Sequence, residues 1–289
     1  MNYALLTDAN GDIYPELAEK MGIEVVPMAF SLDGQDYLNY IDNREMSPKD
    51  FYAALRQEKK VTTSAINPAQ WADYMRPILE ADKDLLVVAF SSGLSTTYNS
   101  AVIASMDLQE EFPTRQILVV DSLCAAMGEG LFTYMVWEKI QSGATLKEAY
   151  DYAEETKLHI IHWFTVDDLQ FLKRGGRISG AAAAVGTMLS VKPILRVTNE
   201  GKLTSHSKAR GRKASLNALV AKMEESAIDP TKHVAYISHG DCLEDALYVK
   251  EQIMTSLGVP DVFLNYVGPP VGCHAGPGTL ALGFYGKER

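Results

Sequence analysis

The chain of 289 residues contains only three cysteines, Cys124, Cys242 and Cys273. They are odd in number, far apart and free of any Cys-x-x-Cys pair, so neither a disulfide framework nor a metal site is indicated. No stretch approaches the roughly 20 consecutive apolar residues that a membrane-spanning helix needs. The N-terminal sequence MNYALLTDAN has neither the basic nor the apolar segment of a secretory signal peptide. We therefore expect a protein of the reducing cytoplasm.

Positive charge is also scarce. The formal net charge is -10, and basic residues accumulate only between Lys208 and Lys213. A chain this acidic repels a phosphate backbone, which argues against binding to nucleic acid. The same argument allows at most transient contact with a membrane surface.

The common catalytic motifs are missing. The sequence has no GxxxxGK[ST], no GxSxG, no HExxH, and no GxGxxG after its first expected strand. His159 and His162 are three residues apart, but they adjoin an apolar strand and have no carboxylate at ligand spacing. We interpret both histidines as structural, and we expect no bound cofactor.

Short apolar runs alternate with amphipathic stretches, which is typical of α/β architecture. Ser47 precedes one expected helix as its N-cap, and Thr145 with Glu148 forms a capping box at another. The expected strands are 1–7, 23–30, 84–90, 116–120, 163–166, 191–197, 202–205, 234–239 and 261–267. The expected helices are 14–21, 48–56, 68–81, 97–111, 127–142, 145–159, 209–224 and 243–257.

The pattern changes near residue 158. Before it, strands and helices alternate as in a doubly wound, mostly parallel sheet. After it, strands 191–197 and 202–205 form a pair around the turn Asn199-Glu-Gly201, and the arrangement is mixed. We therefore predict an N-terminal α/β domain over 1–158 and a C-terminal α/β domain over 159–289, whose final segment can pack back at the interface.

Three polar loops follow expected strands, where ligands bind in open α/β sheets. They are 62–68, 91–97 and 272–278. Ser95 lies directly before a helix, where it either holds an anion at the positive end of the helix dipole or merely caps the helix. His274 lies among glycines that allow close backbone approach, in either a functional or a structural role.

Two further features have more than one interpretation. The segment 171–178 presents Lys173, Arg174 and Arg177 around a glycine turn, which suits an anion clamp, a docking surface or a solvated turn. Asp8 ends the first strand, as either a catalytic acid or a turn-forming N-cap.

Taken together, these segments resemble the DegV family of bacterial fatty-acid-binding proteins, which includes the B subunits of fatty acid kinase. The resemblance covers essentially the whole chain. Its motifs are Thr7-Asp8, Thr63-Ser64, Ser91-Ser-Gly-Leu-Ser95, Val120-Asp121-Ser122, Leu172-Lys-Arg-Gly-Gly-Arg-Ile-Ser179, Val191-Lys-Pro-Ile-Leu195, Arg210-Gly-Arg-Lys213 and His274-Ala-Gly-Pro-Gly278.

The resemblance implies a two-domain protein that holds one long-chain fatty acid, such as palmitate, stearate or oleate, in a tunnel between the domains. The family's carboxylate-binding residues fall on Thr63, Ser95 and His274. Ser64 and Ser92 are their neighbours, and the arginine of the family's basic loop is Arg174.

The resemblance also implies a partner. In the kinase B subunits, a separate ATP-using subunit phosphorylates the bound acid, so the chain is expected not to be an enzyme by itself. Arg210 and Arg212 match a basic segment that would dock this kinase.

Elementary energetics agree with a lipid ligand. A sixteen-carbon acid buries about fourteen methylenes at roughly 0.8 kcal/mol each, for about 11 kcal/mol of gross driving force. An unpaired carboxylate would cost several kcal/mol, so the site needs polar donors at one end. Candidate tunnel linings are 23–30, 181–189 and 280–284.

Two alternatives stay open. One is a small-molecule phosphotransferase or hydrolase that uses Asp8, Ser95 and His274, which requires a carboxylate within hydrogen-bond reach of His274. The other is a lipid sensor that signals through the basic segment around Arg210.

Overall fold

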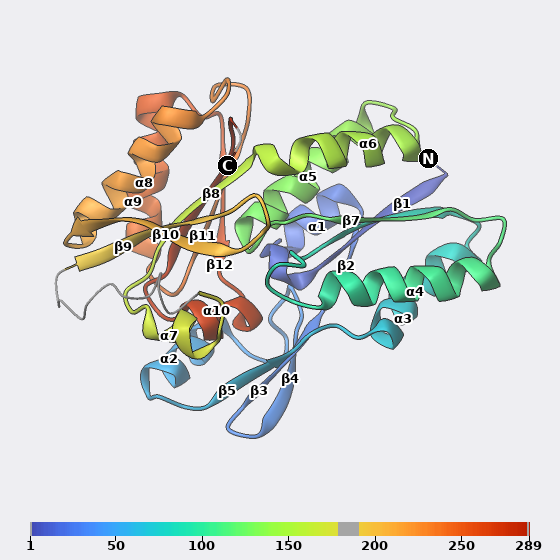
Figure 1. Ribbon diagram of the computed structural model, residues 1–289, viewed down its shortest axis with the longest axis horizontal. Helices are drawn as coiled ribbons and strands as arrows, with labels where there is room; N and C mark the ends of the chain where they lie inside the picture. Colours follow the sequence, from blue (N-terminus) through green and yellow to red (C-terminus); the bar gives the residue numbers. More distant parts are fainter. Residues whose placement is uncertain (1, 179–190, 288) are drawn as a thin grey trace.

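The computed structural model describes residues 2–178, 191–287 and 289. Its first sheet is entirely parallel, with the strand order β2-β1-β6-β7 (Figure 1). The strands are β1 (Tyr3–Asp8), β2 (Glu24–Val26), β6 (Asp84–Ala89) and β7 (Ile117–Asp121). The predicted mostly parallel N-terminal sheet is confirmed.

Helices cover both faces of this sheet. Leu6 and Val87 face a core formed with α3 (Pro68–Glu80) and α4 (Thr97–Glu111). Leu5, Leu86 and Val88 face the opposite core, which contains α5 and α6. Both faces are buried, so these strands read as continuous apolar runs in the sequence. The other helices of this part are α1 (Pro15–Met21), α5 (Met127–Gln141), α6 (Leu146–Thr156) and the 3-10 turns η1 (Ala9–Gly11) and η2 (Lys157–His159).

A small antiparallel sheet, with the order β4-β3-β5, projects from the parallel one. It contains β3 (Met28–Leu32), β4 (Gln35–Asn39) and β5 (Val61–Ser64), and α2 (Pro48–Arg56) joins β4 to β5. The prediction of one strand over 23–30 is wrong, because the run divides at Pro27 into β2 and β3. Proline has no backbone N–H to donate to a ladder, so the chain can leave one sheet there and enter another.

The second large sheet is mixed, with the order β10-β9-β8-β13-β11-β12, and only β11 and β12 run parallel. This mixed C-terminal sheet was also predicted. Its strands are β8 (Ile160–Thr165), β9 (Val191–Val197), β10 (Leu203–Arg210), β11 (Ala235–His239), β12 (Val262–Tyr266) and β13 (Leu280–Tyr285). One face packs on α8 (Arg212–Ser226) and α9 (Leu243–Leu257).

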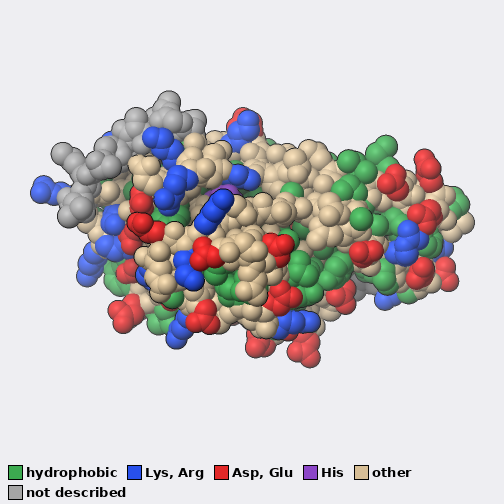
Figure 2. Space-filling view, turned by 90° about the horizontal axis from the view of Figure 1, so that it is seen from below, with side chains coloured by type: hydrophobic (Ala, Val, Ile, Leu, Met, Phe, Trp, Pro, Cys, Tyr) green, Lys and Arg blue, Asp and Glu red, His purple; other side chains and the backbone are tan. Residues whose placement is uncertain are grey.

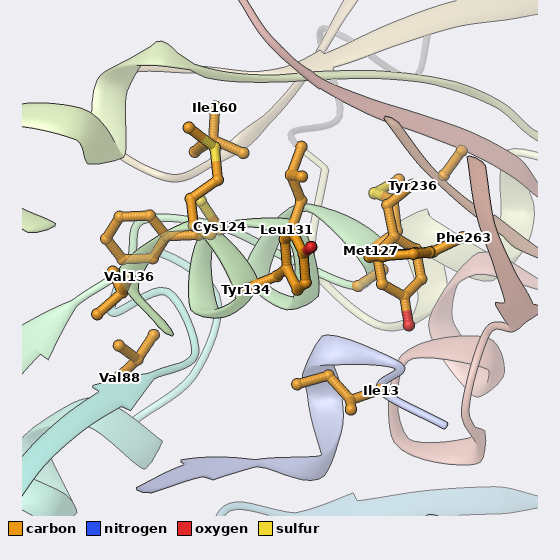
Figure 3. Packing of buried hydrophobic residues seen from close by; sticks show 14 of the residues in the cluster. Ile13, Val88, Cys124, Met127, Leu131, Tyr134, Val136, Ile160, Tyr236 and Phe263 are labelled. Carbon is orange, nitrogen blue, oxygen red and sulfur yellow. The ribbon is translucent and has the colours of Figure 1, made fainter. Parts of the chain in front are cut away.

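The other face of the mixed sheet packs on α5, which connects the two halves of the chain. Met127 and Leu131 of α5 belong to one buried cluster with Tyr236 and Phe263 of the mixed sheet. Figure 3 shows these side chains together with Val88 of the parallel sheet. A helix that is buried on nearly all sides explains the apolar sequence of α5.

Two short helices replace predicted loops. The basic turn at 171–178 begins with α7 (Gln170–Arg174), and His274 lies on the last turn of α10 (Pro269–Ala275) rather than in a glycine loop. Proline at the first positions of α10 suits a helix start, because the first N–H groups of a helix have no intrahelical acceptor.

The start of the predicted helix 209–224 is also wrong. β10 pairs with β9 as far as Arg210 opposite Val191, and α8 begins only after Gly211, whose φ is +87°. The caps at Ser47 and at Thr145 with Glu148 are confirmed.

Within the described residues, no helix combines the length and the apolar composition needed to cross a membrane. The candidate lining 181–189 lies outside the described residues.

Candidate functional site

An apolar cavity lies where the parallel sheet, the small sheet and the mixed sheet approach one another. Its lining comes from β5, from the segments after β6 and β7, from β8, and from α10. Apolar side chains dominate, among them Met28, Phe90, Leu94, Met127, Phe164, Leu172, Val197, Leu203, Val267, Val271 and Ala281. A concave, mostly apolar site with a few polar groups is the usual form of a small-molecule site.

The structure places Thr63, Ser95 and His274 around this one cavity. The Thr63 hydroxyl and His274 Nε2 are 3.1 Å apart, although the two residues are 211 positions apart in the chain. The Ser95 hydroxyl accepts a hydrogen bond from the Thr97 backbone N–H at 3.2 Å and lies 2.9 Å from the Thr97 hydroxyl. Ser95 therefore holds the start of α4 and also borders the cavity.

Ser64 and Ser92 lie outside this cavity. Ser64 follows Thr63 on β5, so its side chain points to the opposite face of the strand, into a separate groove beside Phe30 and Tyr37. Ser92 is exposed and borders a shallow pocket that adjoins Ser95.

Arg174 and Arg177 have different positions. Arg174 is exposed and its guanidinium lies 4.7 Å from the centre of the Phe171 ring, on an outer cleft. Arg177 is half-buried and borders both that cleft and the apolar cavity. The chain turns at Gly176, whose φ is +68°, and this turn brings Arg177 inward. Arg174 is predicted from the family resemblance to bind the ligand. In the structure, Arg177 borders the apolar cavity, and Arg174 borders only the outer cleft.

Burial, and then the positive charge of Arg177, lower the pKa of His274 to about 4. The imidazole is therefore neutral at pH 7, with one N–H donor and one acceptor. Two hydroxyls, a neutral imidazole and a nearby guanidinium together form a polar end that suits a carboxylate, because each group can donate a hydrogen bond to its oxygens.

Gly175 packs directly against His274, and a Cβ atom there would overlap with Nδ1 of the imidazole. Gly175 has helical φ and ψ, so alanine strains no backbone angle and acts only on the ring. We expect Gly175→Ala to displace His274 and to weaken the binding of an anionic ligand several-fold, with little change in melting temperature. Isothermal titration with palmitate tests this. Equal affinity of Gly175→Ala and the wild type would show that the position of the ring is unimportant.

Asp12 anchors the helix that carries His274. Its carboxylate accepts a hydrogen bond at 2.9 Å from the N–H of Gly268, which precedes α10. Burial raises the pKa of Asp12 from 3.8 to about 7, although the bond to Gly268 opposes the shift. One carboxylate oxygen has no hydrogen-bond partner among the described residues.

This raised pKa predicts a pH-dependent stability. Protonation favours the folded state, so the stabilisation is complete below about pH 4 and is lost as the pH rises through about 7. We expect Asp12→Asn to abolish this dependence and, at pH 8, to exceed the wild type in free energy of unfolding by up to about 4 kcal/mol. Urea denaturation between pH 4 and pH 8 measures it, with the exposed Asp36→Asn as control. Parallel pH profiles for wild type and Asp12→Asn would contradict it.

Asp8 takes the structural role. Its carboxylate caps η1, accepting hydrogen bonds from the backbone N–H groups of Asn10 at 3.0 Å and Phe90 at 2.9 Å. Burial raises its pKa, and burial and the charge of Asp8 raise the pKa of the neighbouring Glu129. No hydrogen bond among the described residues joins Asp8 to His274, so the triad that the hydrolase alternative requires is not assembled.

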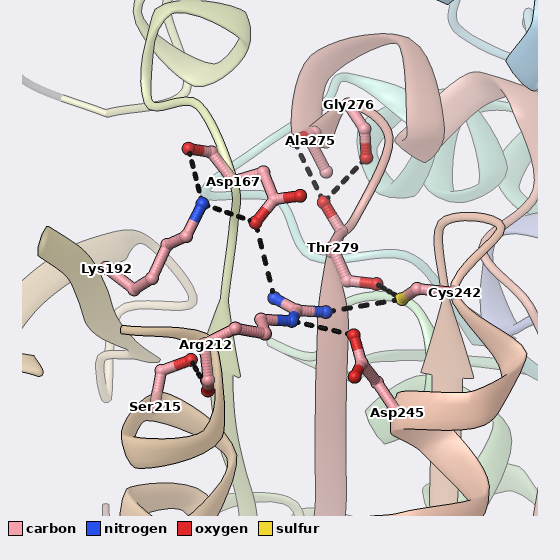
Figure 4. Close-up of polar contacts among 9 residues, drawn as sticks. All are labelled: Asp167, Lys192, Arg212, Ser215, Cys242, Asp245, Ala275, Gly276 and Thr279. Atoms are coloured by element: carbon pink, nitrogen blue, oxygen red, sulfur yellow. Dashed lines mark hydrogen bonds and ion pairs between the residues drawn. The ribbon is translucent and has the colours of Figure 1, made fainter. Parts of the chain in front are cut away.

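The two arginines expected to dock a partner also differ. Arg210 is exposed at the end of β10. Arg212 is largely covered, and its Nε donates to Asp245 at 2.7 Å while its Nη1 lies 3.7 Å from Asp167 (Figure 4). Arg212 therefore contacts residues of its own chain, whereas Arg210 is exposed to solvent.

The outer cleft adjoins the polar end of the cavity. Thr63, Arg177 and His274 border both spaces, so the polar end can be reached from the surface. Five basic side chains and three acidic ones line the cleft: Arg56, Lys59, Lys60, Arg174, Arg177, Glu58, Asp167 and Asp168. Figure 2 views the molecule from the end where α2, α7 and α10 lie, and lysine and arginine side chains gather on one part of this face. This excess of basic groups attracts anions despite the net negative charge of the chain.

Comparison with known proteins agrees with this architecture. The DegV family profile matches residues 2–287. The chain belongs to the DegV family. A DegV domain-containing protein of Clostridium perfringens is 37% identical over 287 residues, which cover 99% of this chain and 98% of the relative.

Two solved structures superpose closely. A Thermus thermophilus protein described by its fatty acid binding is 29% identical, with a TM-score of 0.86 and coverage of 99% of this chain and 100% of that one. The fatty acid kinase B3 protein of Streptococcus pneumoniae, solved loaded with linoleic acid, is 17% identical, with a TM-score of 0.86 and the same coverage. At 17% identity, this second likeness shows the shared fold.

Proposed function

We propose that this DegV protein binds one long-chain fatty acid, with the acyl chain in the apolar cavity and the carboxylate at Thr63, Ser95, His274 and Arg177. The observation that carries the proposal is the shape of the site. A mostly apolar cavity ends in a small group of hydrogen-bond donors, three of which also border an outer cleft. The Thermus thermophilus relative is described by its fatty acid binding, which supports the same ligand class.

The polar end offsets the cost of burying a carboxylate. Once the Thr63–His274 hydrogen bond opens, both groups and the Ser95 hydroxyl can donate hydrogen bonds to the carboxylate, and Arg177 adds a positive charge. A head group held this way has three neutral donors and one guanidinium around it, and its oxygens lie beside the outer cleft rather than deep in the protein.

We infer that the bound carboxylate is presented to a separate ATP-dependent kinase that forms an acyl phosphate. The support is geometric. Three of the four residues proposed to hold the carboxylate, Thr63, Arg177 and His274, border the basic outer cleft, through which a phosphoryl group can approach. The fold shared with the fatty acid kinase B3 protein agrees with this role. Arg174 and Arg210, both exposed, would contact the kinase rather than the lipid.

Native mass spectrometry of gently purified protein tests the binding proposal. We expect an added mass equal to one sixteen- or eighteen-carbon acid, which disappears after delipidation and returns with added palmitate. Protein that neither retains nor regains a fatty acid, and instead hydrolyses acyl or phosphoryl esters, would favour the enzyme alternative.

A second experiment separates the kinase partner from the lipid sensor. Palmitate-loaded protein is mixed with a fatty acid kinase catalytic subunit and ATP, and acyl phosphate is trapped as its hydroxamate. Product formation that is lost in Arg210→Ala, while palmitate binding is unchanged, supports presentation to a kinase. Binding without any product would favour a sensor.

A further inference from the structure

The inference begins with His162, a histidine in the apolar part of the cavity. His162 is at the centre of β8, is 1% exposed, and borders the cavity together with Met127, Phe164 and Ala281. His162 and Phe164 are two residues apart on one strand, so they share the face that looks toward α5.

The surroundings of the ring are built from small residues. Gly128 of α5 packs so closely that a Cβ atom there would overlap with the imidazole, and Gly283 is the partner of His162 in the neighbouring strand β13. The fold therefore makes room for this ring from two elements.

Its hydrogen-bonding capacity is unused. On the described part of the chain, neither Nδ1 nor Nε2 has a hydrogen-bond partner. Burial, and then the charge of Arg289, lower its pKa well below the ordinary value, so the ring is neutral and has one donor and one acceptor. Buried polar groups are rarely left unpaired, because an unmade hydrogen bond is costly.

Other polar residues of the cavity are already engaged. The hydroxyl of Thr63 faces His274, that of Ser95 faces Thr97, and that of Thr279 donates to the Ala275 carbonyl. His162 thus differs from these three in having both of its polar atoms unpaired among the described residues.

We propose that the cavity recognises long-chain acids with a hydroxyl group on the acyl chain. His162 forms the hydrogen bond to that hydroxyl through Nδ1, because its Nε2 packs against Gly128. The proposal rests on the proposed fatty-acid-binding function and deepens it. A hydroxyl fits the ring better than a keto group, because it can both donate and accept and so matches either tautomer. A second charged group would not suit the apolar surroundings of His162.

The test measures dissociation constants for stearate and for a series of hydroxystearates that differ in the carbon bearing the hydroxyl. Displacement of a fluorescent fatty acid is the readout. We expect at least one isomer to bind wild type about 3- to 10-fold more tightly than stearate, the factor that one net hydrogen bond gives. His162→Phe should abolish this preference, so that stearate and the hydroxystearates bind this variant with equal affinity.

His206→Phe is the matched control, because His206 is exposed and packs on Trp163 on the other face of the sheet. It should keep the wild-type preference. The inference is wrong if no isomer binds more tightly than stearate, which is the result expected if a water molecule already bonds to His162. It is also wrong if the preference survives in His162→Phe.

A measurement on the wild type alone covers the case in which His162→Phe does not fold. The ring nitrogens of 15N-labelled histidine should shift on addition of the preferred hydroxystearate and not of stearate, and identical spectra would overturn the inference. Failure of the proposed function looks different, because then neither stearate nor any hydroxystearate would bind.

Discussion

Replacing Arg177 with glutamine is expected to weaken palmitate binding by about 10- to 100-fold. Arg177 is the guanidinium that borders the apolar cavity beside Thr63 and His274, and a hydrogen bond to a charged group contributes about 1.5–3 kcal/mol. Fluorescence displacement at pH 7.5 and low salt measures the effect.

Arg174→Gln is the matched control. It removes the same functional group from the same basic segment, but Arg174 is exposed over Phe171 and borders only the outer cleft. We expect its palmitate affinity to stay within about 2-fold of the wild type, because surface charges separated from a ligand contribute little. If Arg174→Gln had the larger effect, the carboxylate would lie in the outer cleft.

Shortening the acyl chain is expected to have the largest effect on affinity. Octanoate has eight fewer methylenes than palmitate, and at roughly 0.8 kcal/mol each their burial contributes up to about 6 kcal/mol. We therefore predict that octanoate binds at least about 1000-fold more weakly, as measured by competition with a fluorescent fatty acid.

The methyl ester of palmitic acid is the control for the head group. It retains the acyl chain but presents no charged oxygen to Arg177 and His274, so it should bind more weakly than palmitate and more tightly than octanoate. Equal affinities of octanoate and palmitate would mean that the apolar cavity does not hold the chain.

Much of the fold could be predicted because its helices carry local signals. The helices at 97–111 and 243–257 have the predicted bounds, and the predicted N-caps at Ser47 and Thr145 accept the expected backbone hydrogen bonds. These features depend on residues within one turn of each other, which a sequence displays directly.

The errors occur where tertiary pairing overrides local preference. Residues 209–210, predicted as the start of a basic helix, are the end of β10 and pair with β9. The run after residue 23 divides at Pro27 because its two parts pair in different sheets. Pro27 marks where the run can divide, but the sheet that each part joins has no signal within the segment itself.

The candidate site shows the same limit. Thr63 and His274 approach across 211 positions, which no spacing rule indicates, and only the family resemblance named them together. The sequence does not indicate that Arg177, rather than Arg174, points inward. The turn at Gly176 that directs Arg177 inward is a feature of the backbone and not of composition. His162 is interpreted from the sequence as structural because it adjoins an apolar strand, but its place within β8 and its unpaired nitrogens appear only in three dimensions.

A crystal structure of the protein with palmitate is the most direct test of the account. We predict that the carboxylate oxygens lie at roughly 3 Å from the hydroxyls of Thr63 and Ser95, from His274 Nε2 and from the guanidinium of Arg177. The acyl chain should run past Phe164 into the apolar cavity. A palmitate with its carboxylate elsewhere, or with its chain outside this cavity, would contradict it.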